Sequence, residues 1–153
     1  MSFRLAVVGS NERVNHVRTP WREALLLPGA RQMGNLRRLM ESRPFFERIP
    51  DQSLIASPVG TRGSHQRATR ASGGSYAFIY TPDGQPFDVS LEMISGPTIS
   101  VGWFNPRNGN FDLLGLRART NVARFTPPEE GFDWVLVLDD SSRNFPAPST
   151  SSE

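Results

Sequence analysis

A change in hydrophobic periodicity near residue 51 constrains the fold of this chain more than any other feature. Before that point apolar residues recur every three or four positions, and after it they recur every second position. In segment 87–92 Phe, Val and Leu alternate with Asp, Ser and Glu, which predicts a strand with one dry and one wet face, because the side chains of a β-strand point to opposite faces in turn. Large apolar residues also occupy every second position of segments 76–81 and 99–104, which are further strand candidates.

One run of residues is apolar at every position. It reads Trp134-Val135-Leu136-Val137-Leu138, so it has no wet face. We expect this run to form a central strand that is covered on both sides. Shorter strand candidates are segments 54–57, 66–71, 111–114 and 122–125.

Turn-forming residues separate the candidate strands. The chain contains 13 Gly and 13 Pro. Thr81-Pro82-Asp83-Gly84 favours a type I turn, and Asn105-Pro106-Arg107-Asn108-Gly109 favours a hairpin in which Gly109 adopts a left-handed conformation. About seven or eight short strands, spaced by roughly 8–12 residues, are typical of a sandwich. The sequence therefore predicts a mainly β fold, an antiparallel two-sheet β-sandwich over residues 51–140, preceded by a short helical segment.

That preceding segment covers residues 20–50. Thr19 and Pro20 are suited to begin a short helix, and Pro28-Gly29 ends it. A second helix is predicted over residues 30–43, and its apolar residues fall on one face. The candidate interface residues on this face are Met33, Leu36, Leu39 and Met40.

The two ends of the chain carry weaker signals. Residues 1–19 are an uncertain lead-in, since Gly9 is followed by none of the further glycines of a dinucleotide-binding loop. The apolar run near Met1 is too short for a signal peptide, and no segment is long enough to span a bilayer. As encoded, the chain is expected to be soluble and cytoplasmic, without a membrane partner. Residues 141–153, rich in Ser and Pro, are predicted to be a disordered tail.

The charged residues are distributed unevenly. All 17 basic residues are Arg; residues 1–70 carry a net charge of +7 and residues 71–153 one of −5. Such asymmetry can mark a nucleic-acid-binding arm. Here the Arg residues are scattered among apolar positions and no Lys accompanies them, so no nucleic-acid partner is predicted.

The sequence offers little that could support catalysis. The chain has no Cys and two His, His16 and His65, which excludes thiolate chemistry and the common zinc patterns. Ser64 precedes His65, but neighbours in an extended chain point to opposite faces. The acidic pairs Glu129-Glu130 and Asp139-Asp140 do not form the opposed carboxylates that glycoside hydrolysis needs. We therefore predict no catalytic residue, no metal and no cofactor in this chain.

The aromatic residues divide into two groups. Exposed flat rings are a common means of gripping sugar rings or a fibre, whereas rings on the dry faces of strands belong to the core. The rings predicted to be core are Trp103, Trp134, Phe78 and Phe125. The candidates for an exposed or interfacial binding surface are Trp21, Phe45, Phe46 and Phe104.

Several motifs, taken in order, resemble a known arrangement. The first set is Trp21-Arg22-Glu23-Ala24-Leu25, Pro28-Gly29-Ala30-Arg31-Gln32-Met33, Glu41-Ser42-Arg43-Pro44 and Pro50-Asp51-Gln52-Ser53-Leu54. It resembles the end of the catalytic barrel of apiosidase-like glycoside hydrolases. The second set is Gly74-Ser75-Tyr76-Ala77, the turn from Trp103 to Gly109, Phe125-Thr126-Pro127-Pro128 and the run from Asp133 to Leu138. It resembles the β-sandwich attached to that barrel, known as the "putative collagen-binding domain of a collagenase".

The resemblance covers about residues 20–140. It departs from the family at Asn105, where relatives usually have Asp, and it does not include the barrel that carries the catalytic carboxylates. No catalytic residue is therefore carried over. The resemblance implies a non-catalytic accessory β-sandwich that buttresses or contacts a glycoside hydrolase barrel. The alternative is a carbohydrate- or collagen-binding module that brings a hydrolase to its substrate.

Without the barrel, the apolar face of the second helix lacks the neighbours that the family arrangement gives it. That face must fold back onto the sandwich, self-associate or stay exposed. The expected partners are therefore a glycoside hydrolase barrel or a second copy bound through the N-terminal helix. Polysaccharide and collagen are the ligands expected of the binding-module alternative.

Overall fold

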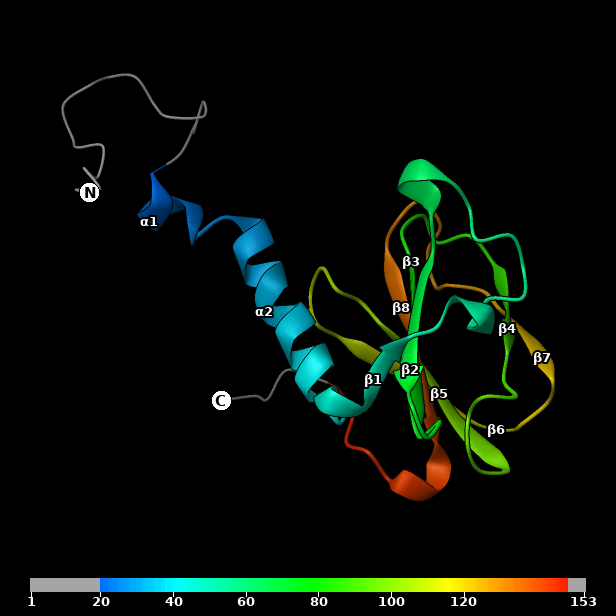
Figure 1. Cartoon of the computed structure of the whole chain (residues 1–153). Coiled ribbons are helices and arrows are strands. Elements are labelled where there is room, and N and C mark those ends of the chain that lie inside the picture. The colour runs from blue at the N-terminus through cyan, green and yellow to red at the C-terminus, as the bar shows by residue number, and fades with distance from the viewer. Residues whose placement is uncertain (1–19, 149–153) are drawn as a thin grey trace, which may run out of the picture. The chain divides into compact units, whose positions relative to one another are not determined.

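The computed structural model describes residues 20–148, which divide into two parts, 20–31 and 32–148 (Figure 1). The first part contains the single turn α1 (Trp21–Ala24) and the beginning of α2 (Pro28–Glu41). The predicted lead-in, Thr19 included, lies outside the described residues. No helix among the described residues is long and apolar enough to cross a membrane.

Helix α2 matches the predicted second helix to within two residues at each end. It begins at Pro28, because the first turn of a helix does not need the N–H group that proline lacks. It ends before Pro44, whose ring disfavours a helical conformation of the preceding residue. At this end the Ser42 hydroxyl donates a hydrogen bond of 2.7 Å to the carbonyl oxygen of Leu39.

Eight strands lie within the described residues and form two antiparallel sheets (Figure 1). They are β1 (Arg48–Pro50), β2 (Arg67–Ala71), β3 (Tyr76–Thr81), β4 (Phe87–Ser90), β5 (Thr98–Phe104), β6 (Phe111–Ala118), β7 (Val122–Phe125) and β8 (Trp134–Asp140). The larger sheet has the order β1-β2-β3-β8-β5-β6, and the smaller one pairs β4 with β7. The predicted two-sheet β-sandwich is confirmed.

Strand β8 is the centre of the larger sheet. It pairs with β3 on one side, where Phe78 lies opposite Val137, and with β5 on the other, where Trp103 lies opposite Leu136. All seven of its residues are buried. The prediction of a central strand covered on both faces is therefore confirmed.

Between the two sheets lies the inner core. The alternate residues of each strand that point inward, such as Ile79, Trp103 and Leu136, pack against Phe87 and Phe125 from the smaller sheet. Phe87 meets Trp103 edge to face, with ring centroids 6.1 Å apart. This geometry is favourable for aromatic rings, and it fixes the distance between the sheets at this point.

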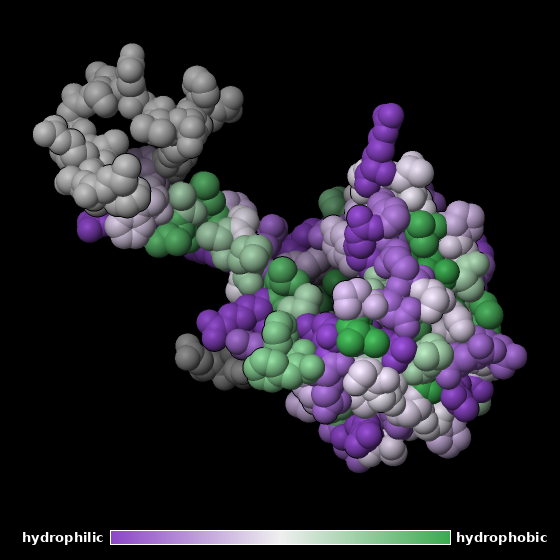
Figure 2. Space-filling view, in the orientation of Figure 1, coloured by the Kyte–Doolittle hydropathy of each residue, from purple (hydrophilic) through white to green (hydrophobic). Residues whose placement is uncertain are grey.

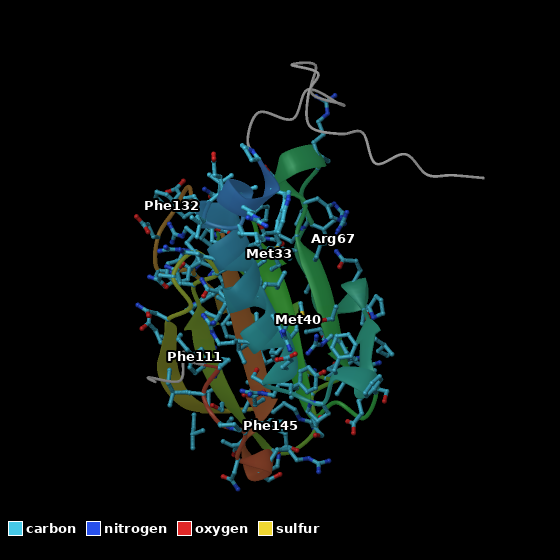
Figure 3. The ribbon with its side chains drawn as sticks, turned by 90° about the vertical axis from the view of Figure 1, so that its left-hand side faces the viewer. Met33, Met40, Arg67, Phe111, Phe132 and Phe145 are labelled. Atoms are coloured by element: carbon cyan, nitrogen blue, oxygen red, sulfur yellow. The ribbon has the colours of Figure 1, made fainter. Side chains whose placement is uncertain are left out.

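A second core covers the outer face of the larger sheet. Its buried residues are Leu39, Ala71, Tyr76, Phe78, Phe104, Val135 and Val137, and Met40, Phe111 and Phe145 pack against them. Figure 3 shows α2 in front of this sheet, with Met40 toward the lower end and Met33 toward the upper end. The sheet is therefore dry on both faces because α2 forms a third layer, which explains why β8 has no polar residue before Asp139.

Two predicted segments differ from the structure. Segment 54–57 is not a regular strand: a 3-10 turn over Gln52–Leu54 is followed by one isolated bridge between Ile55 and Val89. The Asp51 carboxylate accepts a hydrogen bond of 3.1 Å from the Ser53 N–H, which favours the turn over an extended chain.

The second difference concerns the tail, for which disorder was the expectation from Ser141 onward. Ser141–Arg143 form a 3-10 turn capped by the Asp140 side chain, and Phe145 packs against the outer core. The prediction is wrong for residues 141–148, because an aromatic residue among the Ser and Pro residues has a buried surface to join. Residues 149–153 lie outside the described residues.

Candidate functional site

The C-terminal half of α2 is fixed to the sandwich by a buried ion pair. Arg43 binds Asp139 through two parallel hydrogen bonds, Nε to Oδ1 at 2.8 Å and Nη2 to Oδ2 at 2.7 Å. Their side chains are only 1% and 8% exposed. Asp139 follows Val135 and Val137 on the outer face of β8, so alternation alone directs its carboxylate toward the helix.

The same guanidinium also holds the C-terminal tail. Its Nη1 donates to the carbonyl oxygens of Ser42 and Pro146, at 2.8 and 2.9 Å. The Phe145 ring lies over the guanidinium at 4.8 Å from its centroid. Arg43 thus ties together three segments that lie far apart in the sequence, the end of α2, the end of β8 and the tail.

A second arginine joins α2 to the strand β1. Arg48 donates from Nη2 to the Met40 carbonyl oxygen at 2.9 Å and from Nε to the Tyr76 hydroxyl oxygen at 3.1 Å. Its guanidinium also lies 4.9 Å from the centroid of the Phe78 ring. The Tyr76 hydroxyl in turn donates to the carbonyl oxygen of Pro44 at 2.9 Å. The carbonyl oxygens of Met40 and Pro44, at and just beyond the end of the helix, thus both accept a hydrogen bond from a side chain.

One turn earlier, α2 contacts the hairpin between β5 and β6. Asn35 is buried and its Nδ2 donates to the carbonyl oxygen of Pro106 at 2.9 Å. The Asn35 amide lies where a side chain on Gly109 would sit, since a Cβ there would come within 2.8 Å of Asn35 Oδ1. Gly109 also has a φ of +80°, as predicted, so both geometry and space favour glycine.

These contacts leave part of the helix face uncovered. Of the four candidate interface residues, Leu39 is buried in the outer core and Met40 packs against it, while Leu36 is half-buried and Met33 is 61% exposed. The face therefore folds back onto the sandwich at its C-terminal end and remains in solvent at Met33. Figure 2 shows further hydrophobic side chains where α1 passes into α2, and these include Leu25, Leu26 and Leu27.

The four candidate binding aromatics differ in their environments. Phe45 and Phe46 form an edge-to-face pair, with centroids 5.7 Å apart, and the Phe46 side chain is completely exposed. In the other part of the chain Trp21 is 69% exposed, with the Arg22 guanidinium 5.2 Å from its ring. Phe104 is fully buried in the outer core. Its predicted surface location is wrong, because α2 covers the face to which β5 directs this ring.

A cluster that the sequence did not single out surrounds Arg107. Its guanidinium lies 4.3 Å from the centroid of Phe132, and its Nε and backbone N–H donate to Asn105 Oδ1 at 3.1 and 3.0 Å. Glu129 and Asp133 pair with it at 3.4 and 3.7 Å. The turn motif from Asn105 to Gly109 predicts a hairpin. It does not indicate the charged partners of Arg107, because these come from the loop before β8.

The polar groups considered for catalysis have structural partners. A ring nitrogen of His65 lies 3.1 Å from the carbonyl oxygen of Gly60, an exposed hydrogen bond. Asp139 and Asp140 point to opposite faces of β8, the first to Arg43 and the second to Ser95 and Ser142. Hydrogen bonds from those two hydroxyls hold the pKa of Asp140 below its ordinary value. Within residues 20–148 no cluster of carboxylates and imidazoles could hold a metal ion.

An antiparallel sandwich with a helix fixed to its outer face is the class of structure defined here, and sequence comparison gives its family. Residues 49–139, more than half of the chain, match the family model described as "Putative collagen-binding domain of a collagenase". The chain belongs to this family. No curated protein matches the sequence significantly.

Among the solved structures that are similar to this chain are two glycoside hydrolases. One is a glycoside hydrolase, 34% identical, with a TM-score of 0.77 over 91% of this chain and 30% of that chain. The other is a glycoside hydrolase family 5 protein from Bacteroides vulgatus ATCC 8482, 35% identical, with a TM-score of 0.74 over 80% of this chain and 26% of that chain. This chain thus spans less than a third of the length of the structures that it matches.

The first match extends beyond the family segment. It covers about 139 of the 153 residues of this chain, which is more than residues 49–153 together contain. The match therefore includes residues before residue 49, where α2 lies. The similarity to this glycoside hydrolase therefore extends into residues that precede the sandwich.

Proposed function

We propose that this chain is a non-catalytic accessory β-sandwich of a carbohydrate-active enzyme, and that α2 mounts it rigidly on a glycoside hydrolase barrel. The family and the two similar glycoside hydrolases support the accessory role. The fixation of α2 by Arg43 supports the rigid mount, because a helix held at one end transmits the orientation of whatever it contacts elsewhere.

The exposed end of the helix face is the surface that we assign to the barrel. Met33 is exposed although the residues one and two turns later on the same face, Leu36 and Leu39, are half-buried and buried. Exposed apolar residues that continue a buried stripe are typical of an interface whose other half is a separate structure. The larger part of the two similar solved chains lies outside the match, which provides the room for such a barrel.

A second function has one specific observation in its favour. The Phe45–Phe46 pair presents a fully exposed ring next to the end of α2. Rings of this kind stack on sugar rings, and they also contact apolar side chains of other proteins. The alternative function is therefore a carbohydrate- or collagen-binding module with Phe46 in its surface.

Retention on insoluble polysaccharide and on collagen, measured side by side with hydrolysis of glycosides, distinguishes the two. The accessory role predicts no hydrolysis and retention on neither material. The binding module is favoured if the wild type is retained, Phe46→Ala is not, and the control Val122→Ala is retained like the wild type. Val122 is the control because both side chains are exposed and only Phe46 is aromatic. Hydrolysis of any glycoside by the purified chain contradicts both.

A further inference from the structure

Strand β6 is a long free edge with an unusual composition. It has eight residues, and within residues 20–148 it pairs with β5 alone. Leu113, Leu114 and Leu116 are exposed by 62%, 63% and 68%. Alternate N–H and C=O groups of an edge strand point away from its neighbour, so such an edge is a template for another strand.

An irregularity in the pairing decides which way the side chains of β6 point. Val101 lies opposite Gly115 and Gly102 opposite Leu113, so Leu114 is an additional residue, a β-bulge. Residues opposite each other share a face, and Val101 faces the inner core. Leu114 and Gly115, which together oppose Val101, therefore both lie on the inner side.

The faces of the remaining residues follow from their partners. Asp112 lies opposite Trp103 and Arg117 opposite Ile99, both of them inner-core residues. Leu113 lies opposite Gly102 and Leu116 opposite Ser100, on the outer side. From Asp112 to Arg117 the side chains thus point to the inner, outer, inner, inner, outer and inner side. This order is the same in both directions along β6, and its midpoint falls between Leu114 and Gly115.

We propose that β6 is a self-association edge, which pairs antiparallel with β6 of a second copy about a two-fold axis between Leu114 and Gly115. In this register Asp112 lies opposite Arg117 of the second copy, and Leu113 lies opposite Leu116. A two-fold axis perpendicular to the sheet keeps inner faces on one side, so every opposed pair shares a face. In a strand without the bulge, residues separated by five or three positions would lie on opposite faces.

The chemistry of the opposed residues fits this register. The two-fold axis generates two Asp–Arg pairs and two Leu–Leu pairs, and opposed charges and apolar pairs each stabilise neighbouring strands. Leu114 lies opposite Gly115 of the second copy, whose missing side chain leaves open space. That glycine lines a groove of about 270 Å³ floored by Val101, Trp103 and Phe125, which can take a leucine side chain.

The charges also explain why the occupant is a second copy rather than any extended peptide. Charged residues on an edge strand ordinarily keep other strands away. Here each charge meets its opposite only when the incoming strand carries the same sequence in this register, which discriminates against other partners. A single pair of edge strands buries less area than a standard interface, so we expect a reversible dimer at high protein concentration.

Analytical ultracentrifugation of the whole chain across a concentration series tests the proposal. We expect a reversible monomer–dimer equilibrium. Asp112→Arg or Arg117→Asp places like charges opposite each other and should weaken association by about tenfold or more, as for like charges in close juxtaposition. The double variant restores opposite charges and should return the dissociation constant to within about threefold of the wild-type value.

Matched controls separate the edge from other surfaces. Leu113→Lys should abolish the dimer, whereas Val122→Lys, at another exposed apolar residue, on β7, should not. Thermal unfolding confirms that each variant is folded, which matters for Arg117 because its guanidinium lies 5.2 Å from the Phe125 ring. A chain that stays monomeric at all concentrations overturns the proposal. A dimer whose dissociation constant is unchanged by both charge reversals, and which is lost in Met33→Glu, also overturns the proposal.

Discussion

Arg43 is the residue on which most of the fold outside the sandwich depends. Its guanidinium makes four hydrogen bonds, to Asp139, Ser42 and Pro146, and it is almost completely buried. A buried pair of this kind contributes little relative to a well-packed apolar pair, but the loss of one partner leaves a buried charge without compensation. The pair therefore acts mainly as a specific attachment of α2 to β8.

Replacement of Arg43 by Met should lower the free energy of unfolding by about 3–5 kcal/mol, because the Asp139 carboxylate then stays buried without a cation. Urea denaturation followed by circular dichroism measures the change. The double variant Arg43→Met/Asp139→Leu should recover much of it, since both polar groups are then absent. A single variant as stable as the wild type would show that Asp139 reaches solvent, against the structure.

Asp140 makes the stability depend on pH. Hydrogen bonds from Ser95 and Ser142 lower its pKa, and hydrogen bonds from Ser53 and Arg70 lower that of Asp51. A carboxylate whose pKa is lower in the folded than in the unfolded chain stabilises the fold at pH values above its unfolded pKa of about 3.9. This contribution is lost as the pH falls below that value toward the folded pKa.

The midpoint of thermal unfolding should therefore fall between pH 5 and pH 3. In Asp140→Asn the drop over this range should be smaller than in the wild type, although the variant is less stable at pH 7. Arg37→Gln is the control, because Arg37 and its partner Glu41 are exposed and surface pairs contribute little. An equal drop of the midpoint in Asp140→Asn and in the wild type would show that Asp140 does not contribute to the pH dependence of stability.

At the scale of the element, α2 is one helix with two environments. Leu39 is 1% exposed and packs in the outer core, while Met33, on the same predicted face, is 61% exposed. Leu39→Ala should cost about 2–5 kcal/mol through lost burial and a cavity, and Met33→Ala should change stability by less than about 0.5 kcal/mol. Denaturant titrations of the two variants give this difference, and equal effects would contradict the position of the helix.

The sequence predicts the elements well where one local signal dominates. The alternation of apolar and polar residues in β4, the apolar run of β8 and the left-handed Gly109 all agree with the structure, and segments 76–81 and 99–104 form strands as predicted. Each of these features depends on neighbours a few residues away. The two-sheet sandwich then follows from the number and spacing of the strands.

The sequence failed where long-range contacts decide. Phe104 has the period of a strand residue, but only the docked helix shows that its outer face is dry. The 141–148 segment has the composition of a disordered tail, and its order depends on Arg43, about a hundred residues earlier. The bulge in β6 likewise has a sequence signal only in Gly115, whose φ is +121°. No local pattern could have shown which leucine is the additional residue.

At the scale of the whole molecule, two of the surfaces that carry exposed apolar residues have different expected partners. Met33 continues the stripe of α2, which we assign to a glycoside hydrolase barrel, and the leucines of β6 form the edge that we assign to a second copy. The two assignments are independent, since the first depends on the comparisons with glycoside hydrolases and the second on the register of β5 and β6.

The central claim, that α2 mounts this domain on a barrel, is tested most directly in a chimera. In it, this chain replaces the matching quarter of the Bacteroides vulgatus glycoside hydrolase. The measurement is the thermal unfolding midpoint of chimera and isolated chain, each with Met33→Glu or the control Val122→Glu. We expect Met33→Glu to lower the midpoint by several degrees, equivalent to about 1–2 kcal/mol, in the chimera alone. An equal midpoint for both variants in a folded chimera would contradict it.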